Sequence, residues 1–126
     1  MATLKNIMRR NVKTVKESAT ISEVSRLLIK NKLSGVPVID KNKNLKGFVS
    51  EKDIVGAIAS EKFHNKKVKD IMTEKVIFLE DYTTLDVVSQ VFTRHPIKHL
   101  PVTRKKRLVG IVSRKDVINN LVGQYY

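Results

Sequence analysis

Serine and aspartate occur together at two places in this chain with the same spacing. Ser50 and Asp53 lie in GFVSEKDIV, and Ser113 and Asp116 lie in GIVSRKDVI. An apolar, strand-like run that ends at a serine and is followed by an aspartate predicts that a helix begins at each serine. The backbone N–H groups at such a helix start suit an anion, and the following carboxylate can accept hydrogen bonds from hydroxyl groups. The glycine before each serine, Gly47 or Gly110, allows a neighbour or a ligand to approach the backbone closely.

The same spacing also has a purely structural interpretation. Ser-x-x-Asp before an apolar residue is a capping box, in which the serine accepts from a backbone N–H and the aspartate bonds back to the serine. The motif alone favours this interpretation, because helix caps far outnumber ligand sites. The two roles are compatible, since a site without ligand can keep its cap.

The two motifs belong to a longer internal repeat. KNIMRRNVKTV matches KDIMTEKVIFL at an offset of 64 residues, which is the separation of Met8 and Met72. The offset falls to 63 at Gly47 and Gly110, because the turn RKKR is one residue shorter than DKNKN. A length change confined to a polar turn is typical of two copies of one supersecondary unit.

Each copy predicts the order strand, helix, strand, strand, helix. Short β-type runs at Val12–Val15 and Val76–Leu79 come first, and Thr20 to Glu23 forms a capping box that opens the first helix. The two later strands are GVPVID and LKGFVS in one copy, and HLPVT and RLVGIVS in the other. The apolar residues expected on the inner faces of the first helices are Ile21, Val24, Leu27 and Leu28, and Leu85, Val88, Val91 and Phe92.

The second helices begin near Ser50 and Ser113. We expect their inner faces to carry Ile54, Val55 and Ile58 in one copy, and Val117, Ile118 and Leu121 in the other. A copy of about 60 residues has a thin core, so the two copies should bury their apolar faces against each other. The expected fold is α+β, with β-α-β-β-α repeats at residues 1–59 and 68–126, joined by a linker at 60–67 and packed face to face.

Composition excludes several classes of protein. The chain of 126 residues has no cysteine, which rules out thiol catalysis, thiolate zinc sites and disulfides. It has no run of about 20 apolar residues, so we expect a soluble, cytoplasmic protein. The 25 Lys and Arg against 12 Asp and Glu give a net charge of +13, which attracts anions from phosphate to nucleic acid.

The ordered set of motifs, including SGVPVID, KHLPVT and the doubled G-h-h-S-x-x-D, resembles a tandem cystathionine-beta-synthase (CBS) domain pair, or Bateman module. The resemblance covers nearly the whole chain and implies a stand-alone module, because no room remains for an effector domain. Such pairs are regulatory sensors of adenosine-containing ligands such as AMP, ADP, ATP and S-adenosylmethionine. The resemblance therefore implies a non-catalytic protein that binds such a ligand in the cleft between the repeats.

The resemblance also assigns roles to residues. It places Asp116 and Asp53 on the ribose, where an acidic side chain can accept from two hydroxyls. Around the phosphate or hydroxyls it places Ser113, Ser50, Lys98, His99 and Arg114, and around the adenine it places Ser34, Leu33, Val12 and Ile97. Lys98 and His99 replace a pair that is often His and Arg in AMP-binding members, yet they keep charge and donors. Because the first copy has Glu51, Ser34 and Gly35 at the positions of Arg114, Lys98 and His99, we expect the Asp116 site to fill first.

Other functions find less support in the residues. Spacing alone would let His95 and His99 share a metal on a helix, but Pro96 interrupts that helix and no third ligand follows, so we expect no metal. No known catalytic motif occurs, and no cofactor beyond the adenosine ligand is expected. Two alternatives remain: a basic nucleic-acid-binding protein, and a dimerisation module with a vestigial ligand site. We expect a homodimer formed through the amphipathic helices, as the resemblance implies; the regulated protein stays unidentified.

Overall fold

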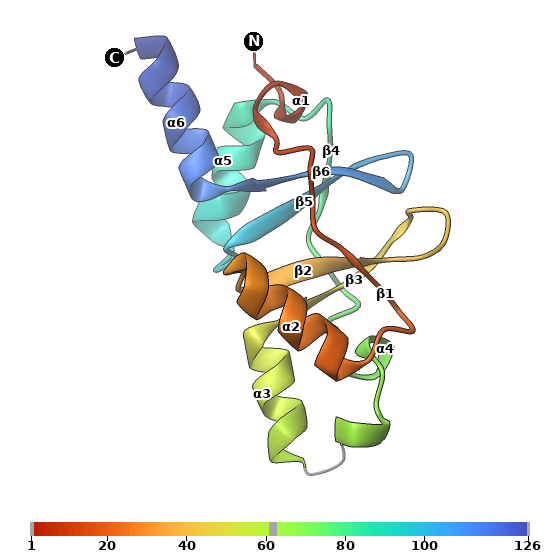
Figure 1. Cartoon of the computed structure of the whole chain (residues 1–126). Helices are drawn as coiled ribbons and strands as arrows, with labels where there is room; N and C mark the ends of the chain where they lie inside the picture. Colours follow the sequence, from red (N-terminus) through yellow and green to blue (C-terminus); the bar gives the residue numbers. More distant parts are fainter. Residues whose placement is uncertain (1, 61–62, 126) are drawn as a thin grey trace. The chain divides into compact units, whose positions relative to one another are not determined.

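The computed structural model describes residues 2–60 and 63–125 of the chain (Figure 1). These residues form two compact units. One unit is Lys13–Val76, and the other combines Met1–Val12 with Ile77–Tyr126. Each unit is described in turn.

The unit Lys13–Val76 contains one three-stranded sheet with helices packed on it. Its elements in chain order are β1 (Val15–Lys16), α2 (Ile21–Asn31), β2 (Gly35–Ile39), β3 (Leu45–Ser50), α3 (Glu51–Ala59), η1 (Phe63–Asn65) and α4 (Val68–Ile71). Strand β1 pairs parallel to β2, and β2 pairs antiparallel to β3. The side chain of Thr20 caps α2 by accepting from the backbone N–H of Glu23 at 3.0 Å, as its sequence predicts.

The second unit repeats this plan. Its elements are α1 (Leu4–Ile7), β4 (Leu79–Glu80), α5 (Leu85–Arg94), β5 (His99–Arg104), β6 (Arg107–Ser113) and α6 (Arg114–Tyr125). Strand β4 runs parallel to β5, and β5 runs antiparallel to β6. The predicted α+β class and the β-α-β-β-α order of each repeat are therefore confirmed.

The first strand of each repeat is shorter and later than the sequence predicted. Val12–Val15 and Val76–Leu79 were expected, but β1 is Val15–Lys16 and β4 is Leu79–Glu80. Only these residues reach partners on the neighbouring strand, in the pairs Val15↔Val38 and Leu79↔Val102. An apolar run without a partner strand has no ladder to join, so β-propensity alone misplaced the boundary.

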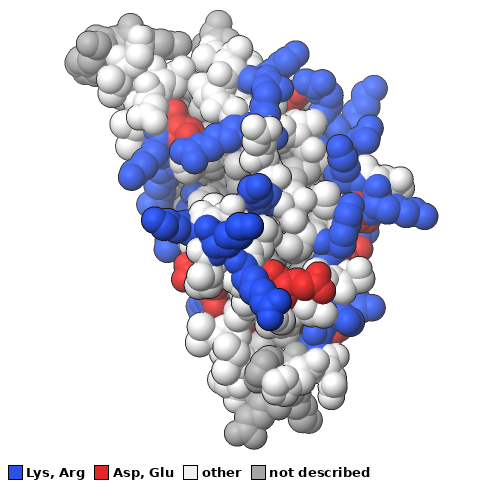
Figure 2. Space-filling model, in the orientation of Figure 1, with Lys and Arg blue, Asp and Glu red and all other residues white. Residues whose placement is uncertain are grey.

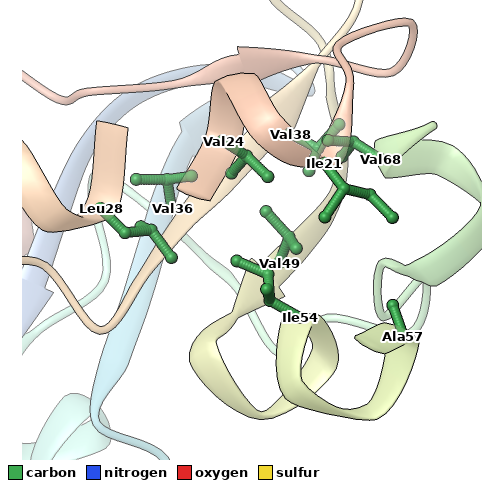
Figure 3. Packing of buried hydrophobic residues seen from close by; sticks show 9 residues of the cluster. All are labelled: Ile21, Val24, Leu28, Val36, Val38, Val49, Ile54, Ala57 and Val68. Carbon is green, nitrogen blue, oxygen red and sulfur yellow. The ribbon is translucent and has the colours of Figure 1, made fainter. Parts of the chain in front are cut away.

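A core of small aliphatic side chains lies between the sheet and the helices of the unit Lys13–Val76. Figure 3 shows nine of its residues pointing toward one another from α2, β2, β3, α3 and α4: Ile21, Val24, Leu28, Val36, Val38, Val49, Ile54, Ala57 and Val68. The other unit has a matching cluster of Leu4, Met8, Val88, Phe92, Leu100, Val102 and Val112. The inner faces predicted for the first helices are thereby confirmed apart from Leu85, which is half-buried and lies outside the clusters; Leu27 and Val91 are partly buried at the edges of theirs.

The inner faces predicted for the second helices are partly wrong. Ile54 is buried and Val117 is partly buried, as expected. However, the exposed fractions of Val55 and Ile58 on α3 are 65% and 52%, and those of Ile118 and Leu121 on α6 are 56% and 46%. Helix α3 turns Ile54 and Ala57 toward the core, and a helix can present only one stripe of its surface to a sheet. The remaining apolar residues are left at the surface of the chain.

The opening segment of each repeat packs in the unit formed by the other repeat. Helix α1 belongs with α5 and α6, and Arg9 forms an isolated β-bridge with Ile111 of β6 (Figure 1). In the same way α4 contacts α3 and β3, and Thr73 bridges to Phe48. The compact units therefore do not follow the sequence repeats, and the proposed boundaries at residues 59 and 68 stay a prediction about the repeats.

Candidate functional site

Asp116 is the most buried of the predicted ligand-binding residues. It lies in the first turn of α6, and one of its oxygens, Oδ2, accepts hydrogen bonds from the backbone N–H of Ser113 at 2.8 Å and from its hydroxyl at 3.1 Å. The Asp116 N–H lies 3.4 Å from Ser113 Oγ, so the capping box is formed. The structural interpretation of the motif therefore holds, and the cap fixes the carboxylate in place.

Asp53 has the same arrangement at the start of α3. Its Oδ2 accepts from the backbone N–H and the hydroxyl of Ser50 at 2.9 and 3.0 Å. The first N–H of this helix, that of Glu51, donates to the carbonyl oxygen of Ser34 at 2.9 Å. This N–H is consequently already paired, which leaves fewer free donors for an anion than the sequence suggested.

Arg9 makes the contact that the sequence did not reveal. Its Nε donates to Asp116 Oδ1 at 3.0 Å, and the ion pair joins a side chain that is 66% exposed to one that is 9% exposed. The backbone positions Arg9, because its N–H and carbonyl both pair with Ile111, at 2.9 and 3.0 Å. Asp116 is thus held from two sides, by Ser113 at one oxygen and by Arg9 at the other.

Other basic residues lie near this carboxylate. His99 is the strand partner of Ser113 and Lys98 precedes it, whereas Arg114, which follows Ser113, directs its Nη2 to the carbonyl oxygen of Phe92 at 3.5 Å. Burial lowers the pKa of His99 below its ordinary value, and the positive charges of Lys98 and Arg9 lower it further, against the opposing effect of Asp116. His99 therefore favours the neutral state at neutral pH and offers an anion a hydrogen-bond donor rather than a full charge.

A methionine fills the space beside the glycine of each motif. A Cβ on Gly110 would lie 2.5 Å from Sδ of Met8, and one on Gly47 would lie 2.7 Å from Sδ of Met72 and 2.8 Å from the carbonyl oxygen of Thr73. The neighbour that requires these glycines is therefore the opening segment of the other repeat. This packing sets the path of the backbone that carries Arg9.

The remaining predicted site residues fall into the two units. Leu33 is partly buried against the core of the unit Lys13–Val76, which also contains Ser34. Ile97 is partly buried against the core of the other unit, which also contains Val12 and the exposed Lys98. The structure brings Asp116, Ser113, His99 and Arg9 together in one unit, and Asp53, Ser50 and Ser34 in the other.

Positive charge is spread over the face drawn in Figure 2. Figure 2 shows lysine and arginine side chains over much of the drawn face, separated by uncharged surface and fewer acidic groups. Within residues 2–60 and 63–125, no three His, Cys, Asp or Glu side chains are grouped so that they could hold a metal ion. None of the helices formed by the described residues combines the length and the apolar character that a bilayer crossing requires.

The repeated mixed sheet, its two helices and the capped Ser-x-x-Asp at the second helix define a class of paired domains. The profile of the CBS domain matches the chain twice, at residues 4–60 and 68–123. These matches cover most of the chain, so the chain belongs to the CBS domain family and is a tandem CBS domain pair.

Two curated relatives differ in how much of them the chain covers. It is 31% identical to the uncharacterized protein MJ1426 of Methanocaldococcus jannaschii, over 94% of this chain and 90% of that protein. It is 30% identical to MJ1225 of the same organism, over 94% of this chain but only 42% of that protein. The chain therefore spans nearly the whole of one relative and less than half of the other.

Two solved structures of the same fold contain ligands. CBSX2 in complex with AMP is 30% identical, has a TM-score of 0.88 and matches over 98% of both chains; CBSX2 comes from Arabidopsis thaliana. The CBS domain pair of protein MJ0100, in complex with 5′-methylthioadenosine and S-adenosyl-L-methionine, is 28% identical with a TM-score of 0.83, again over 98% of both chains. Adenosine-containing ligands are thus bound by structurally similar members of this family.

Proposed function

We propose that this chain is a non-catalytic sensor that binds an adenosine-containing ligand, with Asp116 and Asp53 accepting hydrogen bonds from the ribose hydroxyls. One observation carries the proposal: a buried carboxylate, fixed by its own helix cap, is paired with Arg9 and lies close to His99, which Lys98 precedes. A carboxylate can accept from a diol, and the flanking donors suit a phosphate. The adenosine ligands of CBSX2 and MJ0100 support the same ligand class.

Calorimetric titration of the purified chain with AMP, ADP, ATP and S-adenosylmethionine tests this proposal. We expect saturable binding of at least one of the four. Asp116→Ala should weaken that binding about tenfold or more, the loss expected when hydrogen bonds to a charged group disappear. No heat of binding from any of these ligands would refute the proposal.

Asp70→Ala is the matched control for this substitution. Asp70 Oδ2 accepts from the backbone N–H of Lys67 at 2.8 Å, so it also closes a helix cap in its own unit. The proposal gives Asp70 no contact with the ligand, so Asp70→Ala should leave the affinity unchanged. If both substitutions weaken binding equally, the loss at Asp116 reflects a damaged cap rather than ribose recognition.

The proposal extends to a homodimer. Val55 and Ile58 on α3, and Ile118 and Leu121 on α6, expose apolar surface that a second copy of the chain can bury. Ile58→Lys combined with Leu121→Lys should shift the sedimentation coefficient from dimer to monomer. Ile29→Lys, which changes an isoleucine exposed by 80% on α2, should not.

Nucleic-acid binding is the second candidate, and the net charge of +13 is the observation that favours it. If the charge serves duplex DNA or RNA, the affinity should fall steeply with salt because bound counterions are released. We expect weak binding that nearly disappears at physiological salt, since the cations are dispersed over the drawn face (Figure 2). Tight, sequence-selective binding that persists at physiological salt would make this the better function.

A further inference from the structure

The two ligand-binding aspartates differ in how many acceptor positions they leave open. A carboxylate offers about four such positions. Asp116 uses one for Arg9 at Oδ1 and two for Ser113 at Oδ2. Within the described part of the chain, Asp53 accepts only from Ser50, at Oδ2. A diol that donates both hydroxyls therefore fits Asp53 as it stands, but it meets Arg9 at Asp116.

The difference arises at one pair of equivalent positions. Arg9 bridges to Ile111 beside Asp116, and Thr73 bridges to Phe48 in the same place beside Asp53. The two residues are also related by the repeat offset, because each follows the methionine that packs on the motif glycine. A threonine is too short and has no charge, so it cannot form the ion pair that Arg9 forms.

Arg9 is held in a way that permits release. Its side chain is 66% exposed, and an ion pair with so exposed a member contributes little net stability. A guanidinium has five N–H donors, and the one on Nε makes the contact with Asp116. Phosphate attracts the same group through paired hydrogen bonds, so an anion close to Asp116 competes directly for Arg9.

We propose that Arg9 makes the unit containing Asp116 selective for anionic adenine nucleotides over the neutral nucleoside. This inference rests on the proposed function. Without ligand, Arg9 closes Oδ1 of Asp116; a ligand frees that oxygen for its ribose only when its phosphate takes over the guanidinium. Adenosine brings the ribose without the anion and leaves Arg9 in place. The unit containing Asp53 has Thr73 instead and does not make this distinction.

The contact itself is tested without any ligand. In a ¹H–¹⁵N spectrum of the arginine side chains, the Nε–H signal of Arg9 is identified by its loss in Arg9→Thr. Asp116→Asn should move this signal and accelerate its exchange with water, because the charged acceptor is gone. A signal that is the same in wild type and Asp116→Asn would show that the pair does not exist in solution, and the inference would be overturned.

The selectivity is tested by titrating AMP and adenosine into Asp53→Asn protein, in which the Asp116 site is observed alone. Adding Arg9→Thr should raise the affinity for adenosine about threefold or more and lower the preference for AMP over adenosine about tenfold. Arg10→Thr is the control, since it removes the same charge from the next residue, whose Nη2 donates to the carbonyl of Lys5 and not to Asp116.

The outcomes separate the inference from the proposed function. If AMP binds but Arg9→Thr and Arg10→Thr alter the preference equally, the effect is general electrostatics and the role of Arg9 is refuted while the sensor function stands. If neither AMP nor adenosine binds to wild type, the selectivity is refuted, and the proposed function fails with it only when ADP, ATP and S-adenosylmethionine give no binding either. A preference that falls in Arg9→Thr alone supports the inference.

Discussion

Gly110 lies where the opening segment of the chain meets β6, and replacing it with alanine should destabilise the protein. The added Cβ would lie 2.5, 2.8 and 3.0 Å from Sδ, Cγ and Cβ of Met8. Comfortable carbon contacts are about 3.5–4.0 Å, so all three atoms would be too close. The Met8 side chain can rotate its Sδ away, but its own Cβ is fixed to the backbone that pairs Arg9 with Ile111.

The cost follows from how little room Met8 has. Met8 is 7% exposed and is packed in the core cluster, so relief requires the segment to shift away from β6. Overpacking of this kind typically destabilises a protein by about 1–3 kcal/mol. Alanine has less backbone entropy than glycine in the unfolded chain, which offsets less than about 1 kcal/mol of this loss. We expect Gly110→Ala to lower the free energy of unfolding by about 1–2 kcal/mol. The displaced segment carries Arg9, so the preference for AMP over adenosine at Asp116 should fall as well.

Urea unfolding followed by circular dichroism at one fixed protein concentration measures this change, because association would otherwise shift the midpoint. Gly56→Ala is the control, since apart from its chain neighbours and the backbone of its own helix no heavy atom lies within 4 Å of its added Cβ, and alanine at this helical position should gain about 0.5–1 kcal/mol. In a Met8→Ala background, Gly110→Ala should cost less than in wild type, because the contacts with Sδ and Cγ are gone and only the contact with Cβ remains. An unchanged or higher stability of Gly110→Ala in wild type would refute the steric argument.

Two further predictions concern the turn after β5 and the titration of His99. Lys105 and Lys106 have φ of 51° and 72°, in the left-handed region that asparagine and glycine adopt more easily than lysine. The double substitution Lys105→Asn with Lys106→Gly should therefore raise the free energy of unfolding by about 1 kcal/mol, measured as a higher urea midpoint. The control substitution Lys41→Asn should leave the midpoint unchanged. Because burial lowers the pKa of His99, the unfolded chain binds its proton more readily; the stability present above about pH 6.5 should fall as the pH drops below it. In His99→Gln, the free energy of unfolding should therefore fall less between pH 7 and 5 than in wild type. His95→Gln is the control, because His95 is exposed; if the two variants lose stability equally steeply over this pH range, the prediction is wrong.

The sequence determined the architecture because its signals are local and occur twice. The capping residues Thr20, Ser50 and Ser113 and the helical spacing of apolar residues depend on neighbours within a few positions, so their meaning does not change with the fold. The repeat then doubled each signal. Strand boundaries such as Val15 and the exposed side of α3 were not determined, since they depend on which partner strand or surface lies opposite.

Tertiary structure alone decided the surroundings of the two aspartates. The carboxylates could be chosen from Ser-x-x-Asp, because a capping box fixes its own geometry. Arg9 could not be identified in this way, since it lies 107 residues before Asp116. It reaches Asp116 only because its backbone pairs with Ile111, which places the chain's opening segment against β6. Nothing in a local pattern shows which of many arginines comes close to a given carboxylate. The exchange of opening segments between the repeats is a long-range contact, and it brings Arg9 to one motif and Thr73 to the other, so two nearly identical motifs differ chemically.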